Sequence, residues 1–318
     1  MTRSSTDGAA LAVKTTGLTK QFGERKALDG VDLEVPCGVA FGFLGPNGAG
    51  KTTIIRLLLA LAWPTSGSMS VLGHAVPAQR AQALADVGAI VEEPRFYGFL
   101  SGRENLQVNA AARGGTAASR IPAALERVGL AARAGDRVSS YSLGMRQRLG
   151  IARCLLADPA LLFLDEPMNG LDPAGMLEVR GLIRGLVHEG RTVFLSSHLL
   201  DEVQRTCDVA AIVDRGRVVT QGSIDELTAR DRRISIGTDD PERAAALVAN
   251  LHGVDRAAVE SGAVVVSLAA NGTADRELVT EIVRRMLAAR LAIDRVAPIE
   301  SSLEERFLNI TQRLEDEE

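Results

Sequence analysis

The residues whose spacing most clearly supports chemistry form a glycine-rich segment early in the chain. This segment, Gly45-Pro46-Asn47-Gly48-Ala49-Gly50-Lys51-Thr52, fits the pattern G-x-x-x-x-G-K-[ST] at every fixed position. Its glycines let the backbone curl, so that successive N–H groups can point inward at phosphate oxygens. We expect Lys51 to reach the β- and γ-phosphates of a nucleotide and the Thr52 hydroxyl to bind Mg²⁺. The segment predicts a nucleotide-binding loop but does not choose among kinases, GTPases and ATPases.

The sequence on both sides of the loop supports this interpretation. Residues 39–44 are apolar throughout, which is typical of a central strand in a parallel sheet, and a helical pattern starts at Thr53. A helix that begins near Lys51 directs the positive end of its dipole at bound phosphates. The eight loop residues and Thr53 are therefore all candidate contacts of the nucleotide.

A pair of adjacent acids follows a second apolar run. Residues 161–164 read as a buried strand, and Asp165 and Glu166 come directly after it. Ligands of open parallel sheets bind beyond the carboxyl ends of the strands, where both acids emerge. We expect Asp165 to hold the Mg²⁺ shell opposite the phosphate loop, and Glu166 to polarise the attacking water as general base or positioning group. The alternative is that Asp-Glu-Pro merely ends a strand. The complete phosphate loop elsewhere in the chain makes this alternative less favoured.

His198 follows a third apolar run, residues 192–195. From the end of that strand its imidazole could face the γ-phosphate. A lone histidine is more often a structural or surface residue. The spacing by itself leaves both roles open.

Composition narrows the class of protein. The chain has 318 residues, a formal net charge of −4 and 3% aromatic residues, which argues against a nucleic-acid-binding surface. No stretch reaches the roughly 20 apolar residues that a membrane span requires, and the polar start has no signal-peptide core. Any membrane role must then come through a partner chain. Cys37, Cys154 and Cys207 have no metal-ligand spacing and favour reduced thiols in a cytoplasmic protein.

The rest of the chain predicts an α/β protein with two domains. From Val13 onward short apolar runs alternate with helical patterns. An Ala-rich helical stretch is expected at about residues 78–137, broken by Pro94, Gly98, Gly102 and Gly114-Gly115. A composition shift after residues 222–227 indicates a small α+β domain in the order βαββαβ, with a terminal helix from Ser302. Its expected elements are a strand at 233–236, a helix at 241–251, two strands of which the second is 263–268, a helix at 276–291 and a short strand near 293–296.

Together with one further segment, these motifs resemble the ATPase domains of ABC transporters. The segment is Tyr141-Ser142-Leu143-Gly144-Met145-Arg146-Gln147-Arg148, and it stands where the family has Leu-Ser-Gly-Gly-Gln. Only Ser142 and Gly144 match that signature. Its role needs a serine hydroxyl, a glycine N–H and a helix N-terminus aimed at a γ-phosphate, and all three are retained. The resemblance implies a P-loop NTPase fold: an ABC ATPase domain at 13–227 with a helical subdomain at about 93–158, followed by the α+β domain at 231–318.

The resemblance also implies how the site is completed. In ABC proteins the signature serves the nucleotide of the opposite subunit, so the chain is expected to form a head-to-tail dimer with two ATP molecules between its copies. Residues 169–172 then correspond to the D-loop, and His198 to the histidine that contacts the γ-phosphate. Phe22 takes the place of the aromatic residue that stacks on adenine, although a core phenylalanine is an equal alternative.

One departure from the family pattern concerns the metal. The family normally has a glutamine that contacts Mg²⁺ and relays to the transporter, and the matching place here is Glu92. A carboxylate can still bind Mg²⁺, although it adds negative charge near the γ-phosphate. Our hypothesis is that Glu92 keeps the metal contact and tunes hydrolysis. The alternative is a solvated acid before the turn residue Pro94.

Within the family, the chain is most similar to drug- and bacteriocin-resistance exporters of the daunorubicin and bacitracin type. Three features carry this similarity: the Tyr-Ser-Leu-Gly-Met signature, the Glu92-Glu93-Pro94 segment and the string Ser302-Leu303-Glu304-Glu305-Arg306-Phe307-Leu308. The similarity implies a partner: transmembrane permease subunits, in two copies or as two related chains. The ATPase would then lie at the cytoplasmic face of the membrane, held there by the permease, with no nucleic acid involved.

Two other functions remain as alternatives. A soluble ABC ATPase without a permease would carry two ATPase units or a long coiled coil, and the chain has one phosphate loop and no sustained heptads. An importer ATPase would use its C-terminal extension for regulation, and the exporter-like signature makes this alternative weaker.

Overall fold

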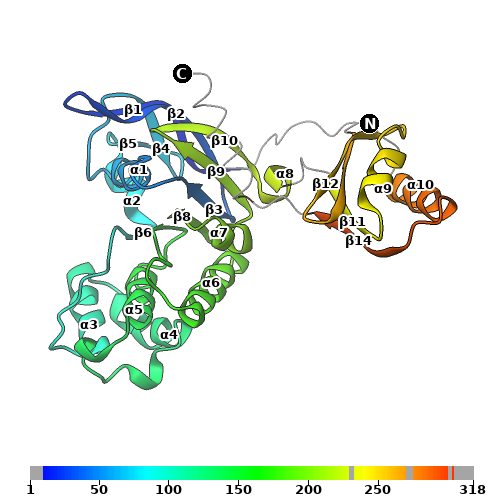
Figure 1. Ribbon diagram of the computed structural model, residues 1–318. Helices are drawn as coiled ribbons and strands as arrows, with labels where there is room; N and C mark the ends of the chain where they lie inside the picture. Colours follow the sequence, from blue (N-terminus) through cyan, green and yellow to red (C-terminus); the bar gives the residue numbers. More distant parts are fainter. Residues whose placement is uncertain (1–9, 229–232, 270–274, 300–302, 304–318) are drawn as a thin grey trace. The chain divides into compact units, whose positions relative to one another are not determined.

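The computed structural model describes residues 10–228, 233–269, 275–299 and 303 (Figure 1). The chain divides into two compact units, Met1–Ile224 and Asp225–Glu318, and each is described by itself. Across the described residues, no helix is long and apolar enough to cross a membrane. The helix expected from Ser302 lies outside the described residues, apart from the buried Leu303.

A six-stranded sheet forms the centre of the first unit. Its strand order is β10-β9-β3-β8-β7-β6, and the pairs among β9, β3, β8, β7 and β6 are parallel. The strands β3, β7 and β8 are buried along their whole length, as a parallel sheet covered on both faces requires. The bounds are β3 Ala40–Leu44, β6 Val87–Ile90, β7 Leu161–Asp165, β8 Thr192–Ser197, β9 Val209–Asp214 and β10 Arg217–Ser223.

A second, antiparallel sheet has the order β2-β1-β4-β5. The helix α1 (Lys51–Leu58) contacts strands of both sheets, and its buried apolar face belongs to their shared core. Burial of each Leu or Ile of that face stabilises the fold by about 2 kcal/mol. The helix that follows the phosphate loop is therefore fixed from two sides. The bounds are β1 Leu11–Phe22, β2 Arg25–Pro36, β4 Ser66–Val71, β5 His74–Val76 and α2 Arg80–Ala85.

The helices α3 (Gly102–Arg113), α4 (Ile121–Arg127) and α5 (Leu143–Leu155) form a helical region at the lower end of the unit in Figure 1. The start of α3 is fixed by a capping box in which Ser101 accepts from the Glu104 N–H and Glu104 accepts from the Ser101 N–H. The prediction of a helical stretch over residues 78–137, broken only from Pro94 onward, is wrong at β6. This four-residue apolar run pairs with β7, and tertiary pairing overrides the helical propensity of its surroundings.

The helix α6 (Pro173–His188) connects the helical region to the sheet. It contacts β3 and β8 on one side and α5 on the other, while α7 (Leu200–Thr206) packs on β3. Two ion pairs add to this connection: Arg148 lies 3.2 Å from Glu178, and Arg127 lies 2.7 Å from Glu189.

The second unit shows the βαββαβ order expected from the sequence, as an antiparallel sheet of order β12-β13-β11-β14. Its core joins apolar residues of the strands to those of the two helices, and includes Ile236, Val248, Val264, Ile282 and Met286. The bounds are β11 Arg233–Thr238, α9 Pro241–Val248, β12 Val254–Glu260, β13 Ala263–Leu268, α10 Asp275–Ala288 and β14 Ile293–Ile299, with α8 at Ile224–Thr228 before them.

Candidate nucleotide-hydrolysing site

The phosphate loop joins the end of β3 to the start of α1, as the sequence predicts. Its shape depends on glycine at two positions, because Gly48 and Gly50 have φ of +85° and +102°. A Cβ on Gly50 would lie 2.5 Å from the carbonyl oxygen of Ala27, so no larger residue fits there. The loop is held to β8 by a hydrogen bond of 3.3 Å from the Gly45 N–H to the Ser197 carbonyl.

Lys51 is the buried cation of this loop, with 6% of its surface exposed. Its ammonium group donates to the carbonyl oxygens of Gly45 at 2.8 Å and Pro46 at 3.1 Å. The first turn of α1 contains no acidic residue, and its cap residue Gly50 offers no side-chain acceptor. The N–H groups at this helix end are thus available to an anion, and with Lys51 they fit a phosphate group.

One serine fixes both acids at the end of β7. Asp165 is 3% exposed and accepts a hydrogen bond of 2.5 Å from the Ser196 hydroxyl. The same hydroxyl oxygen accepts the N–H of Glu166 at 2.9 Å. Ser196 is paired with Asp165 in the sheet and is fully buried. The sequence alone does not assign Ser196 a role, because its position opposite Asp165 follows only from the pairing of β7 with β8.

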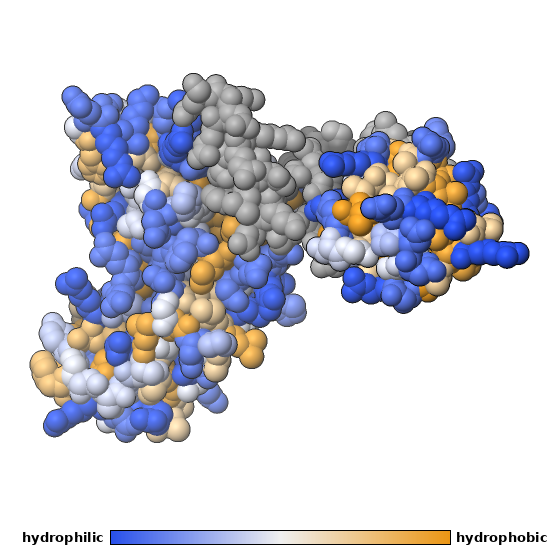
Figure 2. All heavy atoms as spheres, viewed as in Figure 1, coloured by the Kyte–Doolittle hydropathy of each residue, from blue (hydrophilic) through white to orange (hydrophobic). Residues whose placement is uncertain are grey.

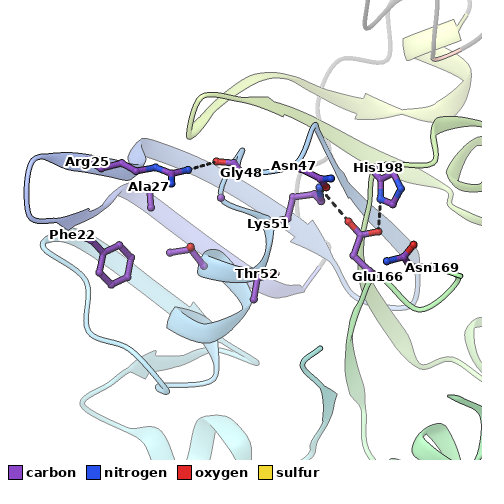
Figure 3. Close-up of a pocket in the computed structure, with 12 residues that line it drawn as sticks. Phe22, Arg25, Ala27, Asn47, Gly48, Lys51, Thr52, Glu166, Asn169 and His198 are labelled. Carbon is purple, nitrogen blue, oxygen red and sulfur yellow. Dashed lines mark hydrogen bonds and ion pairs between the residues drawn. The ribbon is translucent and has the colours of Figure 1, made fainter. Parts of the chain in front are cut away.

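Glu166 joins the phosphate loop to His198. One of its carboxylate oxygens lies 3.2 Å from the Lys51 ammonium, and the other lies 2.9 Å from Nδ1 of His198 (Figure 3). Its φ is +47°, a conformation that costs a non-glycine residue on the order of 1–3 kcal/mol and is concentrated at functional sites. The strained backbone thus directs the carboxylate toward both partners.

These side chains line one cavity of about 630 Å³, a size suited to a small-molecule ligand. Glu166, Asn169 and His198 lie at one end of it, and Phe22 and Arg25 lie at the other (Figure 3). Phe22 is 54% exposed, so it is not the core phenylalanine of the alternative interpretation. The residues that line the cavity are Phe22, Arg25, Ala27, Asn47, Gly48, Gly50, Lys51, Thr52, Thr53, Glu166, Asn169 and His198.

Several candidate residues do not line this cavity. Gly45 and Pro46 accept hydrogen bonds from Lys51 through their carbonyl oxygens, and the loop residue Ala49 and the acid Asp165 are both buried. Ser142 and Gly144 stand at the start of α5, where Ser142 caps the helix by accepting the N–H of Met145 at 3.2 Å. Their absence from the chain's own cavity is compatible with a role toward a second copy.

Glu92 is the candidate metal ligand that the structure places elsewhere. Its carboxylate forms an ion pair with Arg56, on α1, and its side chain is well exposed. It is not among the residues that line the cavity. Within the described part of the chain, no three His, Cys, Asp or Glu residues form a metal-binding group. Of the other two candidate metal ligands, Thr52 lines the cavity, and Asp165 is buried at the end of β7 and does not line it.

The fold and site define a class of protein. A buried lysine in a glycine-rich loop, facing a strained glutamate two strands away, is the arrangement of a nucleotide-hydrolysing P-loop protein. The profile of the ABC transporter family matches residues 28–169.

Comparison with individual known proteins narrows the class of protein further. The bacitracin transport ATP-binding protein BcrA of Enterococcus faecalis is 39% identical over 297 residues, which are 93% of this chain and 94% of that protein. The daunorubicin resistance ATP-binding protein DrrA3 of Streptomyces coeruleorubidus is 37% identical over 310 residues, 95% of this chain and 96% of that protein. A solved ATP-binding subunit of an ABC transporter is 28% identical, with a TM-score of 0.60, and covers 68% of this chain and 91% of its own.

The chain therefore belongs to the ABC transporter family. It is an ATP-binding subunit with ATPase activity, which confirms the resemblance found in the sequence.

Proposed function

We propose that this chain hydrolyses ATP to drive the export of a drug- or antibiotic-type compound through a separate membrane permease. The observation that supports export most directly is the extent of the similarity to BcrA and DrrA3. Both alignments span more than nine-tenths of each chain and so include the second unit as well as the ATPase unit. The names of these relatives state bacitracin transport and daunorubicin resistance. A permease-free ABC ATPase or an importer is less well supported.

The hydrolytic step uses the Lys51, Glu166 and His198 cluster. Glu166 is positioned to orient the attacking water and accept its proton, and His198 holds the carboxylate in place. Lys51 offsets negative charge that develops on the γ-phosphate. Mg²⁺, held by Thr52 and Asp165, would neutralise charge on the β- and γ-phosphate oxygens. Phe22, at the far end of the cavity, is available to stack on adenine.

A second copy of the chain would complete the site. Ser142 is exposed at the N-terminus of α5, a 13-residue helix with no acidic residue in its first turn. Such a helix end favours an anion, and Ser142 and Gly144 do not line the chain's own cavity. In a head-to-tail dimer, each α5 would face the γ-phosphate bound by the other copy.

The permease would dock on the segment around residues 95–103. Two aromatic side chains there are exposed, Tyr97 at 56% and Phe99 at 71%. Tyr97 lines a groove of about 410 Å³, and the ring of Phe99 lies 5.8 Å from the ring of Tyr97, centroid to centroid. Figure 2 shows apolar surface over parts of the helical region, whereas the surface over β1 is largely hydrophilic. Exposed aromatic residues of this kind are frequent at interfaces. The groove is lined by Arg95, Phe96, Tyr97, Asn105, Val108, Asn109, Ala112 and Arg153.

The test is affinity capture of a Glu166→Gln variant from native membranes in the presence of ATP. Blocked hydrolysis should hold the closed dimer on its permease, so that a polytopic membrane protein co-purifies. The matched control, Glu166→Gln with Lys51→Ala, should recover much less because it binds ATP poorly. Recovery of no membrane protein, or of ribosomes or DNA-repair factors, would contradict the permease assignment.

A further inference from the structure

The residue Leu143 makes a contact that the family's signature does not provide. A Cβ built on Gly170 would lie 3.1 Å from Cδ2 of Leu143, so the leucine side chain packs directly over this glycine. A Cβ on Gly144 would similarly lie 3.8 Å from Cδ2 of Leu171. The start of α5 is thus in contact with the turn that follows Glu166. Where this chain has Leu143, the signature of the ABC family has glycine, which has no side chain for such a contact.

The turn from Glu166 to Leu171 is a stiff connection to the hydrolytic site. Its backbone is closed by hydrogen bonds from Asn169 N–H to the Glu166 carbonyl at 3.1 Å and from Leu171 N–H to the Met168 carbonyl at 3.3 Å. Met168 and Leu171 are buried, and Asp172 caps α6 directly after the turn. Gly170 therefore lies in the same closed turn as Glu166 and Asn169, both of which line the cavity.

The other side of the signature is anchored in the helical region by Tyr141. This tyrosine is buried, and its hydroxyl donates to the carbonyl of Arg133 at 2.7 Å. Its ring lies so close to Gly102 that a Cβ there would approach the hydroxyl to 2.4 Å. Arg146 donates to the Tyr141 carbonyl at 2.7 Å. Leu143 thus stands between two parts of the chain that are each held firmly.

We propose that Leu143 is a positioning residue that couples the turn after Glu166 to the N-terminus of α5 in the same chain. This inference rests on the proposed dimer, in which that N-terminus serves the nucleotide of the other copy. A change at Glu166 during hydrolysis reaches Gly170 through the closed turn and reaches α5 through Leu143. The two ATP sites then influence each other through an apolar contact inside each copy, in addition to any contact between copies.

The first test restores the family's glycine with Leu143→Gly and measures ATPase rate against ATP concentration. We expect the Hill coefficient to fall toward one and kcat to fall about fivefold, a size typical of coupled neighbouring residues. Binding of a fluorescent ATP analogue to the dilute chain should stay unchanged, because Leu143 does not line the cavity. Leu143→Met, which retains an apolar side chain, should recover both kinetic values.

A double-mutant cycle separates coupling from simple destabilisation. Gly170→Ala adds a methyl group against Leu143 and strains a φ of +72°; Gly190→Ala is the matched control, because its φ is +86° and nothing lies within 4 Å. The kcat of the double variant Leu143→Gly with Gly170→Ala should differ by about threefold or more from the value expected if the two single effects multiply. The kcat of Leu143→Gly with Gly190→Ala should equal the product of its single effects.

The outcomes distinguish this inference from the proposed function. If Leu143→Gly keeps the wild-type Hill coefficient and kcat, or if both cycles are multiplicative, the coupling role is wrong while the dimeric ATPase stands. If Glu166→Gln fails to dimerise with ATP at all, the proposed dimer itself is wrong, and the coupling role falls with it.

Discussion

Ser196 and Asp165 are joined by a 2.5 Å hydrogen bond between neighbouring strand ends, and the same serine oxygen receives the N–H of Glu166. The residue that we propose holds the metal shell and the residue that we propose orients water are therefore positioned by one buried hydroxyl. Removal of that hydroxyl leaves a buried carboxylate oxygen and a backbone N–H without this partner, which is costly in a site shielded from water.

We expect Ser196→Ala to lower kcat about tenfold, because loss of a hydrogen bond to a buried charged group costs about 1–3 kcal/mol. Steady-state ATPase assays of the purified chain measure the effect. Ser197→Ala is the matched control, since among the residues that the structure describes the Ser197 hydroxyl accepts the N–H of Leu199 and is hydrogen-bonded to neither acid. Equal rates for the two variants would show that Ser196 does not position the acids.

His198→Ala should reduce kcat by about a hundredfold while ATP binding changes little, since groups that assist proton transfer contribute at least this much. The reason is the 2.9 Å contact of His198 with the carboxylate of Glu166. Single-turnover hydrolysis separates this chemical step from binding. His188→Ala, at the exposed end of α6, should keep the wild-type rate. A normal rate for His198→Ala would leave His198 with a structural role only.

The structure places Glu92 on Arg56, so its predicted metal contact requires that this ion pair open. If Glu92 does bind Mg²⁺ during turnover, Glu92→Gln should raise the Mg²⁺ concentration for half-maximal ATPase activity about tenfold. The neighbouring exposed acid gives the control Glu93→Gln. An unchanged Mg²⁺ dependence for Glu92→Gln would leave the residue as the solvated acid of the alternative interpretation.

The three cysteines should differ sharply in reactivity. Burial raises the pKa of Cys154 from 9.0 to about 11, and burial raises the pKa of Cys207 further, while Cys37 is exposed. With a pKa near 11, only about one Cys154 in a thousand is thiolate at pH 8, and the thiolate is the reactive form. Titration with a disulfide reagent at pH 8 should count one fast thiol in the native chain and three after denaturation.

The same shift predicts a pH dependence of stability. The folded chain retains the Cys154 proton more strongly than the unfolded chain. The contribution of this protonation to the free energy of unfolding is therefore full below pH 9 and is lost as the pH rises to about 11. Chemical denaturation at pH 8 and pH 10.5 measures the loss, and Cys154→Ala should reduce it. Rapid reaction of Cys154 in the native chain at pH 8 would contradict its burial.

The sequence predicted those parts of the site that depend on local pattern. Two motifs can be recognised from local residue spacing alone: the loop from Gly45 to Thr52 and the acids after residues 161–164. Both follow parallel strands, and parallel strands end at the same edge of the sheet. Ser196 could not be assigned, because its role depends on the register between β7 and β8. The pairing of Glu92 with Arg56 joins residues 36 positions apart, and the contact of Leu143 with Gly170 likewise depends on tertiary packing.

The strand β6 shows a further limit of local pattern. Its apolar run is only four residues long and lies among alanine-rich helix formers, so its partner β7 decides its conformation. The second unit was easier to predict, because its strands and helices alternate clearly between polar stretches.

We propose that ATP, held by Lys51 and awaiting attack at Glu166, joins two copies of the chain. Light scattering of purified Glu166→Gln with Mg²⁺ and either ATP or ADP tests this proposal. We predict a mass of twice 33.7 kDa with ATP, a smaller mass with ADP, and no release of phosphate. A variant whose mass does not depend on the nucleotide, or which hydrolyses ATP at the wild-type rate, would contradict this account.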